Sequence, residues 1–329
     1  MPARCNRRFK RKITLAPFPI PLLIDTDPGV DDALALLMAF ADERHEVVGL
    51  TIAAGNVGLA HTVANALKLC EVVGRDDVPV FPGCEAPLLH AADDASYVHG
   101  RDGFGDTGYA PAARAAASEH AALAILRLSH EHAGKLLLVA LGPLTNLALA
   151  LKLDPTLPTR IDRCVVMGGA VTGRGNVTPH AEFNAWFDPE AADIVFSGFP
   201  RIELADWEAV VRHGLDQRQA AAWMRDAGTP RAAFYEAISR HTREWSQDRR
   251  GDHWHCADAL AMALALAPEG AAPLVERPLA VELAHGLCRG ATVVDWDRRQ
   301  PERPANAAIL MEYDQARFEA LIRGALAAS

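Results

Sequence analysis

Short apolar runs that favour β-strands alternate along this chain with segments of helical periodicity. The apolar runs lie at residues 21–25, 46–55, 135–142, 163–169 and 201–206. Helical spacing occupies roughly residues 31–41, 59–73, 118–132, 143–151 and 188–196. Because strands that alternate with helices form βαβ units, the pattern predicts an α/β fold with a largely parallel, Rossmann-like central sheet flanked by helices.

The second half of the chain continues as one unit. Residues 215–267 are mostly helical in pattern and are predicted to cap one edge of the sheet, while short β segments after residue 278 precede a final helix at about 313–327. The 329 residues contain no repeat and no sharp change of composition. We therefore predict a single domain over residues 20–329, preceded by a disordered basic tail at 1–19 that holds the cluster "RCNRRFKRK".

Composition excludes several classes of partner. The net charge of −9 disfavours a nucleic-acid surface, which needs basic residues to neutralise phosphates. No run approaches the roughly 18 apolar residues of a membrane span. The six cysteines are scattered and form no C-x-x-C pair, which is typical of a reducing compartment. We expect a cytoplasmic protein with no membrane or nucleic-acid partner.

The stretch "LLIDTDPGVDDALAL" at 22–36 crowds four carboxylates behind the first strand. Aspartates are favoured where a helix starts, which explains one or two of the four but leaves Asp25 and Asp27 unexplained. Carboxylates that gather with carbonyl oxygens suit a hard cation, either Ca²⁺ or Mg²⁺. The spacing is not that of an EF-hand, so other parts of the chain must complete the site.

Polar residues also follow the other strands. They include Asn56, the segment "LGPLTN" and the segment "MGGAVTGRGN". Ligands of such sheets bind outside the carboxyl ends of the strands, so these residues should converge there. The Gly- and Asp-rich stretch 89–108 lacks periodicity and is predicted to be a flap over the site.

Taken in order, "DTDPGVDDALAL", "GN" at 55–56, "LGPLTNLA", "VVMGGA", "GNVTPHAEFNAWFDPEAAD" and "CADALAMALALAP" resemble the calcium-dependent nucleoside hydrolases. The resemblance extends from about residue 20 to 325. It implies an N-ribosyl hydrolase of nucleoside salvage that cleaves the N-glycosidic bond of purine or pyrimidine ribonucleosides. It also implies Ca²⁺ as cofactor, a small-molecule nucleoside as substrate, and a homo-oligomer, either dimer or tetramer.

The resemblance assigns roles to individual positions. It implies that Asp27 accepts a proton from the Ca²⁺-bound water that attacks C1′, with an oxocarbenium-like transition state. The implied metal ligands are Asp27, Asp32, Asp258 and the carbonyl of Leu141. The implied substrate-binding residues are Asp31, Asn56, His99, Met167, Asn176, Glu182 and Asn184. In "AEFN", we expect an extended segment that puts Glu182 and Asn184 on one face and Phe183 on the other.

The chain departs from the pattern at one position. In the best-known branch of the family, a histidine precedes the last metal-binding aspartate and helps to protonate the departing base, whereas this chain has Ala257. His255, Cys256 and Trp254 are nearby candidates for leaving-group activation. Trp245 and Trp254 are also candidates for stacking on a base, and a packing role is an equal alternative.

Two other functions remain open at this stage. One is a calcium-dependent nucleoside- or ribose-binding protein without hydrolysis, which the missing histidine would explain. The other is a Mg²⁺-dependent phosphohydrolase, because D-x-D after the first strand also serves phosphoryl transfer. The second function is disfavoured because "GNVTPHAEFN" has no Lys or Arg to meet a phosphate.

Overall fold

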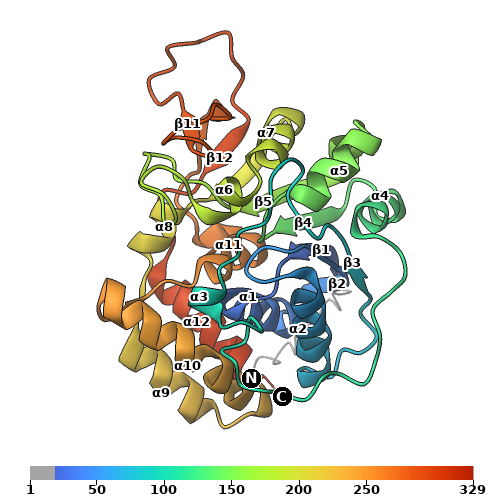
Figure 1. Ribbon diagram of the computed structural model, residues 1–329, viewed down its shortest axis with the longest axis vertical. Helices are drawn as coiled ribbons and strands as arrows, with labels where there is room; N and C mark the ends of the chain where they lie inside the picture. The colour runs from blue at the N-terminus through green and yellow to red at the C-terminus, as the bar shows by residue number, and fades with distance from the viewer. Residues whose placement is uncertain (1–18, 329) are drawn as a thin grey trace, which may run out of the picture.

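The computed structural model describes residues 19–328, and its core is one eight-stranded sheet (Figure 1). The strands run in the order β3-β2-β1-β4-β5-β6-β12-β9. Every paired neighbour is parallel except β9, which is antiparallel to β12 at the edge. In sheet order, their bounds are Val80–Pro82, His45–Ile52, Ile20–Thr26, Leu136–Ala140, Ile161–Met167, Ile202–Ala205, Ala307–Ile309 and Val275–Arg277.

Helices cover both faces of the sheet, as the burial of β1 requires. Successive residues of β1 alternate between two cores, with Leu22 and Ile24 in one and Leu23 in the other. The first core is shared with α1 (Val30–Ala41), α2 (Leu59–Val72), α9 (Gln217–Ala227), α10 (Pro230–Arg250), α11 (Ala257–Leu266) and α12 (Gln315–Ala327). The second core is shared with α4 (Ala121–Glu131), α5 (Thr145–Leu153) and α7 (Pro189–Gly198).

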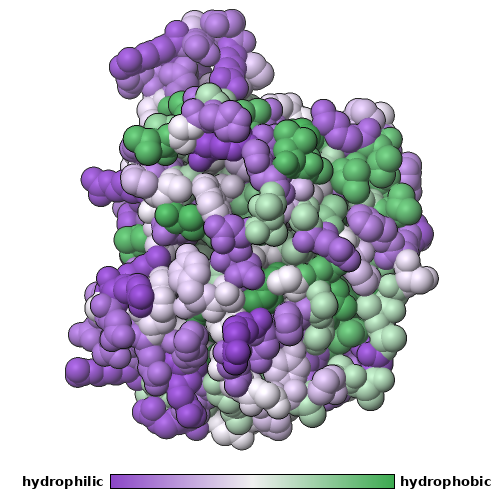
Figure 2. Space-filling view, viewed as in Figure 1, coloured by the Kyte–Doolittle hydropathy of each residue, from purple (hydrophilic) through white to green (hydrophobic). Residues whose placement is uncertain are grey.

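Several short elements lie outside the main sheet and the long helices that cover it. Three short helices are α3 (Ser96–His99), α6 (Phe183–Phe187) and α8 (Trp207–Arg212), and two 3-10 turns lie at Leu157–Arg160 and Pro268–Gly270. Two small antiparallel pairs join β7 (Leu215–Asp216) to β8 (His253–Trp254) and β10 (Leu279–Val281) to β11 (Thr292–Val294). The segment between β11 and β12 projects from the top of the view and is hydrophilic (Figures 1 and 2).

The predicted fold class is confirmed, and the differences lie in short elements. The apolar runs become β1, β2, β4, β5 and β6, with ends that differ from the predicted ones by up to three residues. The strand β3 was not predicted, because three residues that end in proline carry too little periodicity. The predicted tail lies almost wholly outside the described residues. Within residues 19–328 no helix is long and apolar enough to cross a membrane, and the described cysteines form no disulfide.

Parallel strands bring their carboxyl ends to one edge. The register pairs Thr26 with Ile52 on one side and Asp25 with Ala140 on the other, so the residues that follow β1, β2 and β4 emerge together. Asp25 itself is fully buried and accepts hydrogen bonds from the Thr51 hydroxyl at 2.7 Å and from the Asn146 amide at 3.0 Å. These contacts tie three neighbouring elements at the edge where the candidate site lies.

A buried tyrosine ties the end of α11 to the start of α12, and its removal should destabilise the fold. The Tyr313 hydroxyl donates to the carbonyl of Ala267 at 2.8 Å and lies 3.1 Å from that of Ala263. We expect Tyr313→Phe to lower the free energy of unfolding by about 1–2 kcal/mol, because the carbonyls lose a buried donor. Urea denaturation measures the effect. Tyr97→Phe is the control, since Tyr97 is 55% exposed, and equal losses in both variants would contradict this account.

Candidate active site

Asp27 lies at the bottom of a cavity at the carboxyl edge of the sheet. Its Oδ2 atom accepts a hydrogen bond from the backbone N–H of Asn56 at 2.7 Å. Two glycines make room for the carboxylate, because a Cβ atom at Gly55 would lie 2.1 Å from its Oδ2 and one at Gly142 would lie 2.3 Å from its Oδ1. Burial, followed by the charge of Asp32, raises the pKa of Asp27 well above its usual value. A carboxylate whose pKa is raised in this way accepts a proton more readily than an exposed one.

The first turn of α1 supplies the next two carboxylates. Asp32 is held firmly, because its oxygens accept from the Thr26 hydroxyl at 2.5 Å, from the Gly29 N–H at 3.0 Å and from the Asn56 amide at 2.8 Å. Asp31 is different, because its buried Oδ1 atom has no hydrogen-bond partner. Burial, followed by the charge of Asp32, raises the pKa of Asp31 to about 7. The sequence prediction that both residues fall in the first helical turn is confirmed.

Asp258 joins this group from the far end of the chain. It lies in the first turn of α11, and α11 packs along α1. Carboxylate oxygens of Asp31, Asp32 and Asp258 come within 4.8 Å of one another. Burial, followed by the charges of Asp31, Asp32 and Asp27, raises the pKa of Asp258 well above its usual value. Within the described part of the chain no Lys or Arg forms an ion pair with any of these carboxylates, so the cluster fits a cation.

The close group of carboxylates differs from the metal set expected from the sequence. Asp27 lies outside the close group, whereas Asp31, which the sequence assigned to substrate, lies in it. Leu141 lines the cavity, and its carbonyl accepts a hydrogen bond from the Asn184 amide at 2.7 Å. Asp27, Leu141 and Asp258 nevertheless line one cavity of about 830 Å³, counting the space at its mouth. A concave site lined by a few convergent polar groups suits a small-molecule ligand.

A second wall of the cavity is rich in amides. Asn56, Met167, Asn176, Glu182 and Asn184 all line it. The extended segment that the sequence suggested ends at Glu182, which caps α6 and accepts from the backbone N–H groups of Asn184, Ala185 and Gly169. Phe183 also lines the cavity and does not turn away. The prediction was wrong because the carboxylate satisfies helix N–H groups, which favours the helical turn.

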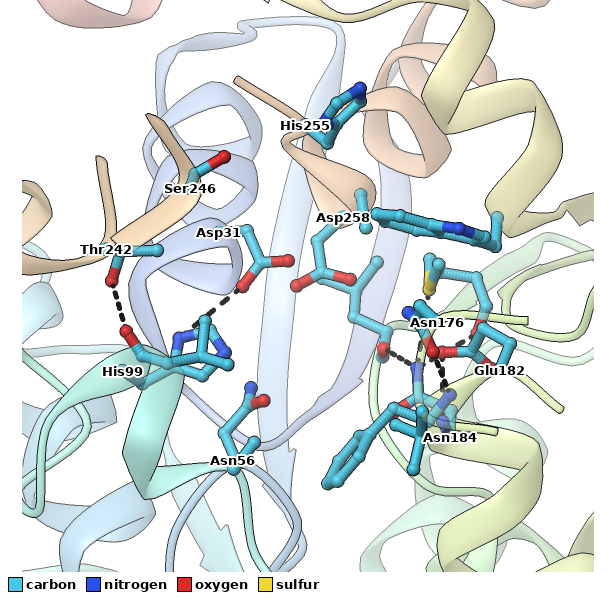
Figure 3. Close-up of a pocket in the computed structure, with 18 of the residues that line it drawn as sticks. Asp31, Asn56, His99, Asn176, Glu182, Asn184, Thr242, Ser246, His255 and Asp258 are labelled. Atoms are coloured by element: carbon cyan, nitrogen blue, oxygen red, sulfur yellow. Dashed lines mark hydrogen bonds and ion pairs between the residues drawn. The ribbon is translucent and has the colours of Figure 1, made fainter. Parts of the chain in front are cut away.

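His99 closes the cavity from the flap. It ends the short helix α3, and its Nδ1 accepts a hydrogen bond from the backbone N–H of Val30 at 3.1 Å. Burial lowers the pKa of His99 to about 4, so the ring is neutral at pH 7 with its proton on Nε2. The Thr242 hydroxyl on α10 donates to the carbonyl of Val98 at 2.9 Å, which ties the flap to α10 (Figure 3).

Of the three residues Trp254, His255 and Cys256 that come shortly before Asp258, only two reach the cavity. Trp254 and His255 line the cavity, and Trp254 also stacks on the buried Tyr235 with ring centroids 5.9 Å apart. Burial, followed by the charges of Arg250 and His253, lowers the pKa of His255 to about 4. Cys256 is buried, and it is absent from the described residues that line the cavity. His255 and Trp254 are therefore the nearby candidates that can reach a ligand.

Sequence reasoning missed several residues that line the cavity, and four of them bear on its chemistry. They are Trp207, Thr242, Ser246 and Arg250. Trp207 directly follows Asp206 after β6, so the rule that ligands bind after strands could have found it. The other three lie on α10 at positions four residues apart, which puts them on one helix face. Nothing in the sequence showed that this face turns toward the cavity.

Residues 22–320 match the model of the inosine-uridine preferring nucleoside hydrolases. Uridine nucleosidase 1 of Arabidopsis thaliana is 45% identical over 177 residues, which make up 54% of this chain and 53% of that protein. The pyrimidine-specific ribonucleoside hydrolase RihA of Salmonella paratyphi C is 36% identical over 315 residues, which cover 92% of this chain and 97% of that protein.

A solved structure of a nucleoside hydrolase also resembles this chain. The purine-preferring ribonucleoside hydrolase from Gardnerella vaginalis superposes with a TM-score of 0.87 at 27% identity, covering 93% of this chain and 98% of that one. The family match spans the whole sheet and the residues that form the cavity. The chain therefore belongs to the inosine-uridine preferring nucleoside hydrolase family.

Proposed function

We propose that this protein hydrolyses the N-glycosidic bond of ribonucleosides to give free base and ribose. The observation that carries the proposal is the buried carboxylate cluster, Asp27, Asp31, Asp32 and Asp258, which faces an amide-rich wall in one cavity. Glycoside cleavage builds positive charge on C1′ and the ring oxygen in the transition state. A cavity lined with carboxylate and amide oxygens stabilises that charge more than it stabilises the neutral substrate.

We assign Ca²⁺ as the cation of the site, held by Asp32, Asp258 and the Leu141 carbonyl together with Asp27 or Asp31. The orphaned Oδ1 of Asp31 and the absence of Lys or Arg ion pairs to these carboxylates in residues 19–328 support a cation there. Hard oxygen ligands of this kind suit Ca²⁺. When bound, Ca²⁺ lowers the pKa of water and attracts the hydroxyl oxygens of ribose.

The protein's own residues perform the other tasks. Asp27 is fixed by the Asn56 N–H and accepts the proton of the attacking water. Asp31, Asn56, Asn176, Glu182 and Asn184 hold the ribose hydroxyls, while Met167 packs against the sugar. The neutral His99 holds the flap to the start of α1 through Val30, which excludes bulk water from the cleaved bond.

We further propose that the chain assembles with copies of itself in the cytoplasm. Four leucines with at least a third of their surface exposed, Leu88, Leu89, Leu283 and Leu287, support this proposal. They lie in two loops that meet where Arg289 contacts His90. Exposed apolar groups gathered in this way are typical of an interface. Light scattering of the purified protein distinguishes a monomer from a dimer or tetramer.

Asp27→Asn should abolish most of the hydrolysis. The amide cannot accept the proton of water, so we expect kcat to fall at least about 100-fold. The assay measures ribose release from uridine, cytidine, inosine, guanosine and adenosine, with Ca²⁺ and after chelation. These five are chosen because the names of the relatives divide between pyrimidine and purine.

The control for Asp27→Asn is Asp162→Asn, an exposed residue at the opposite end of β5, which should leave kcat unchanged. Ribose release that survives in Asp27→Asn would refute the role of Asp27. Binding of nucleoside and Ca²⁺ without any ribose release by the native protein would instead establish a binding protein.

Calcium should stabilise the fold more at neutral pH than in acid. Burial and mutual repulsion raise the pKa of Asp27, Asp31 and Asp258 in the folded chain, and that of Asp31 to about 7. Unfolded aspartates titrate near pH 4, so the folded, metal-free protein binds more protons and should lose stability as the pH rises from about 4 to about 7. A hundredfold excess of Ca²⁺ over its Kd should add about 2.7 kcal/mol at neutral pH.

Urea denaturation with Ca²⁺ and with chelator, at about pH 5 and about pH 7.5, checks this prediction. The double variant Asp31→Asn/Asp258→Asn is the control, because chelated protein without these two charges should vary less with pH. A gain from Ca²⁺ that is as large at pH 5 as at pH 7.5 would contradict the assignment.

A further inference from the structure

The wall of the cavity formed by α10 and its neighbours differs chemically from the carboxylate and amide walls. Figure 3 shows Ser246 and His255 on the opposite side of Asp31 and Asp258 from Asn56 and Asn184. The same wall contains three indole rings, Trp207, Trp245 and Trp254. Flat apolar surfaces of this kind suit an aromatic base, whereas the polar walls suit a sugar. The sugar would then lie against the polar walls and the base against the apolar wall, with the cleaved bond between them.

Arg250 brings a permanent positive charge to this wall. Of the described residues that line the cavity, it is the only Lys or Arg. It ends α10, one turn beyond Ser246, and Gly251 follows with a φ of 71° that stops the helix. Within residues 19–328 the guanidinium has no hydrogen-bond or ion-pair partner, and its contacts there are with aromatic rings. Its N–H donors are therefore free for a ligand.

Two indole rings hold the guanidinium in place. The Cζ atom of Arg250 lies 4.5 Å from the centroid of the Trp207 ring and 5.5 Å from that of Trp245. Planar guanidinium groups stack well on aromatic faces, and such contacts strengthen as water is excluded. Trp207 also contacts the ring of His255, with centroids 5.7 Å apart. Arg250 is thus positioned before any substrate arrives.

The histidine beside it cannot supply the same charge. Burial and the charge of Arg250 lower the pKa of His255 to about 4, so its ring is neutral at pH 7. Ala257 occupies the position at which the resemblance placed a proton donor. The described residues that line the cavity therefore provide one cation for a departing base, and that cation is a guanidinium, which does not give up its proton.

We propose that Arg250 stabilises the departing base through hydrogen bonds to its carbonyl oxygen, and so selects bases that carry one. The inference rests on the proposed hydrolase activity. As the bond between C1′ and the base nitrogen breaks, its electron pair moves to the base and spreads onto the carbonyl oxygens, where the guanidinium donates. Water adds its oxygen to C1′ and passes one proton to Asp27. The released base anion takes a proton from solvent. Asp27 then releases to solvent the proton that it accepted from the attacking water.

This assignment distinguishes one base from another. An arginine pairs with the O6 and N7 acceptors of a 6-oxopurine, whereas adenine presents an amino donor at position 6, which faces the guanidinium with like polarity. Uracil also carries carbonyl oxygens that delocalise its negative charge. Uridine and inosine should therefore depend strongly on Arg250, and adenosine should depend on it less.

The test is Arg250→Met, which keeps the length and apolar contacts of the side chain but removes its charge. Loss of a donor to developing negative charge costs about 100-fold in kcat, and we expect a loss of that size on uridine and inosine with a much smaller change in KM. We expect a loss about tenfold smaller on adenosine. On 4-nitrophenyl riboside, whose phenolate leaves without help, the variant should stay within about threefold of the native protein.

Two variants serve as controls. Arg249 lies over Trp245 at 4.7 Å but is exposed and does not line the cavity, so Arg249→Met should match the native protein on every substrate. Arg250→Lys keeps the charge but loses the planar fork, so it should recover part of the kcat on uridine.

The outcomes separate the inference from the proposed function. Native-like kcat of Arg250→Met on uridine and inosine would overturn the role of Arg250 and leave the hydrolase intact. Equal losses on all four substrates, including the nitrophenyl riboside, would show a structural role and overturn it too. A native protein that releases ribose from neither nucleosides nor the nitrophenyl riboside would overturn the proposed function, and the inference with it.

Discussion

The repulsion among buried carboxylates is the constraint on which the rest of the site depends. Asp31, Asp32 and Asp258 bring oxygen atoms within 4.8 Å of one another in a region from which water is largely excluded. In this dry site, burial and the charge of Asp32 raise the pKa of Asp31 and Asp258, and like charges this close destabilise the fold. The described chain offers no Lys or Arg as a partner. Such an arrangement suits the binding of a cation, because no Lys or Arg of the described chain balances the charge of these carboxylates.

The surrounding structure resists this repulsion through backbone contacts. Asp32 is fixed by the Gly29 N–H and the Asn56 amide, and Asp27 by the Asn56 N–H. Gly55 and Gly142 leave space in which no side chain could fit beside Asp27. These contacts come from segments that follow three neighbouring strands. The parallel sheet therefore both creates the crowding and holds it, because its strands end at one edge.

The cavity has two chemically distinct sides, and under the proposed function they flank the bond that is cleaved. Carboxylates and amides gather where positive charge would develop on the sugar, and Arg250 lies among indole rings where negative charge would develop on the base. Opposite charges placed on opposite sides of a breaking bond stabilise the separated charges of the transition state. Asp31 and Arg250 influence one another through the cavity, since the charge of Asp31 partly offsets the lowering of the pKa of Arg250 by burial.

The sequence by itself determined the layered fold and the acidic half of the site. Alternating periodicities located the main strands along the chain, and the residues near their carboxyl ends included Asp27, Asn56 and Leu141. The helical turn at Phe183, the place of Asp31 beside Asp258, and the wall made by Trp207 and Arg250 were decided only by the tertiary structure. The reason is physical: local patterns report which residues follow a strand or share a helix face. Which distant face turns toward a cavity depends on how α10 and α11 pack against α1 and the flap.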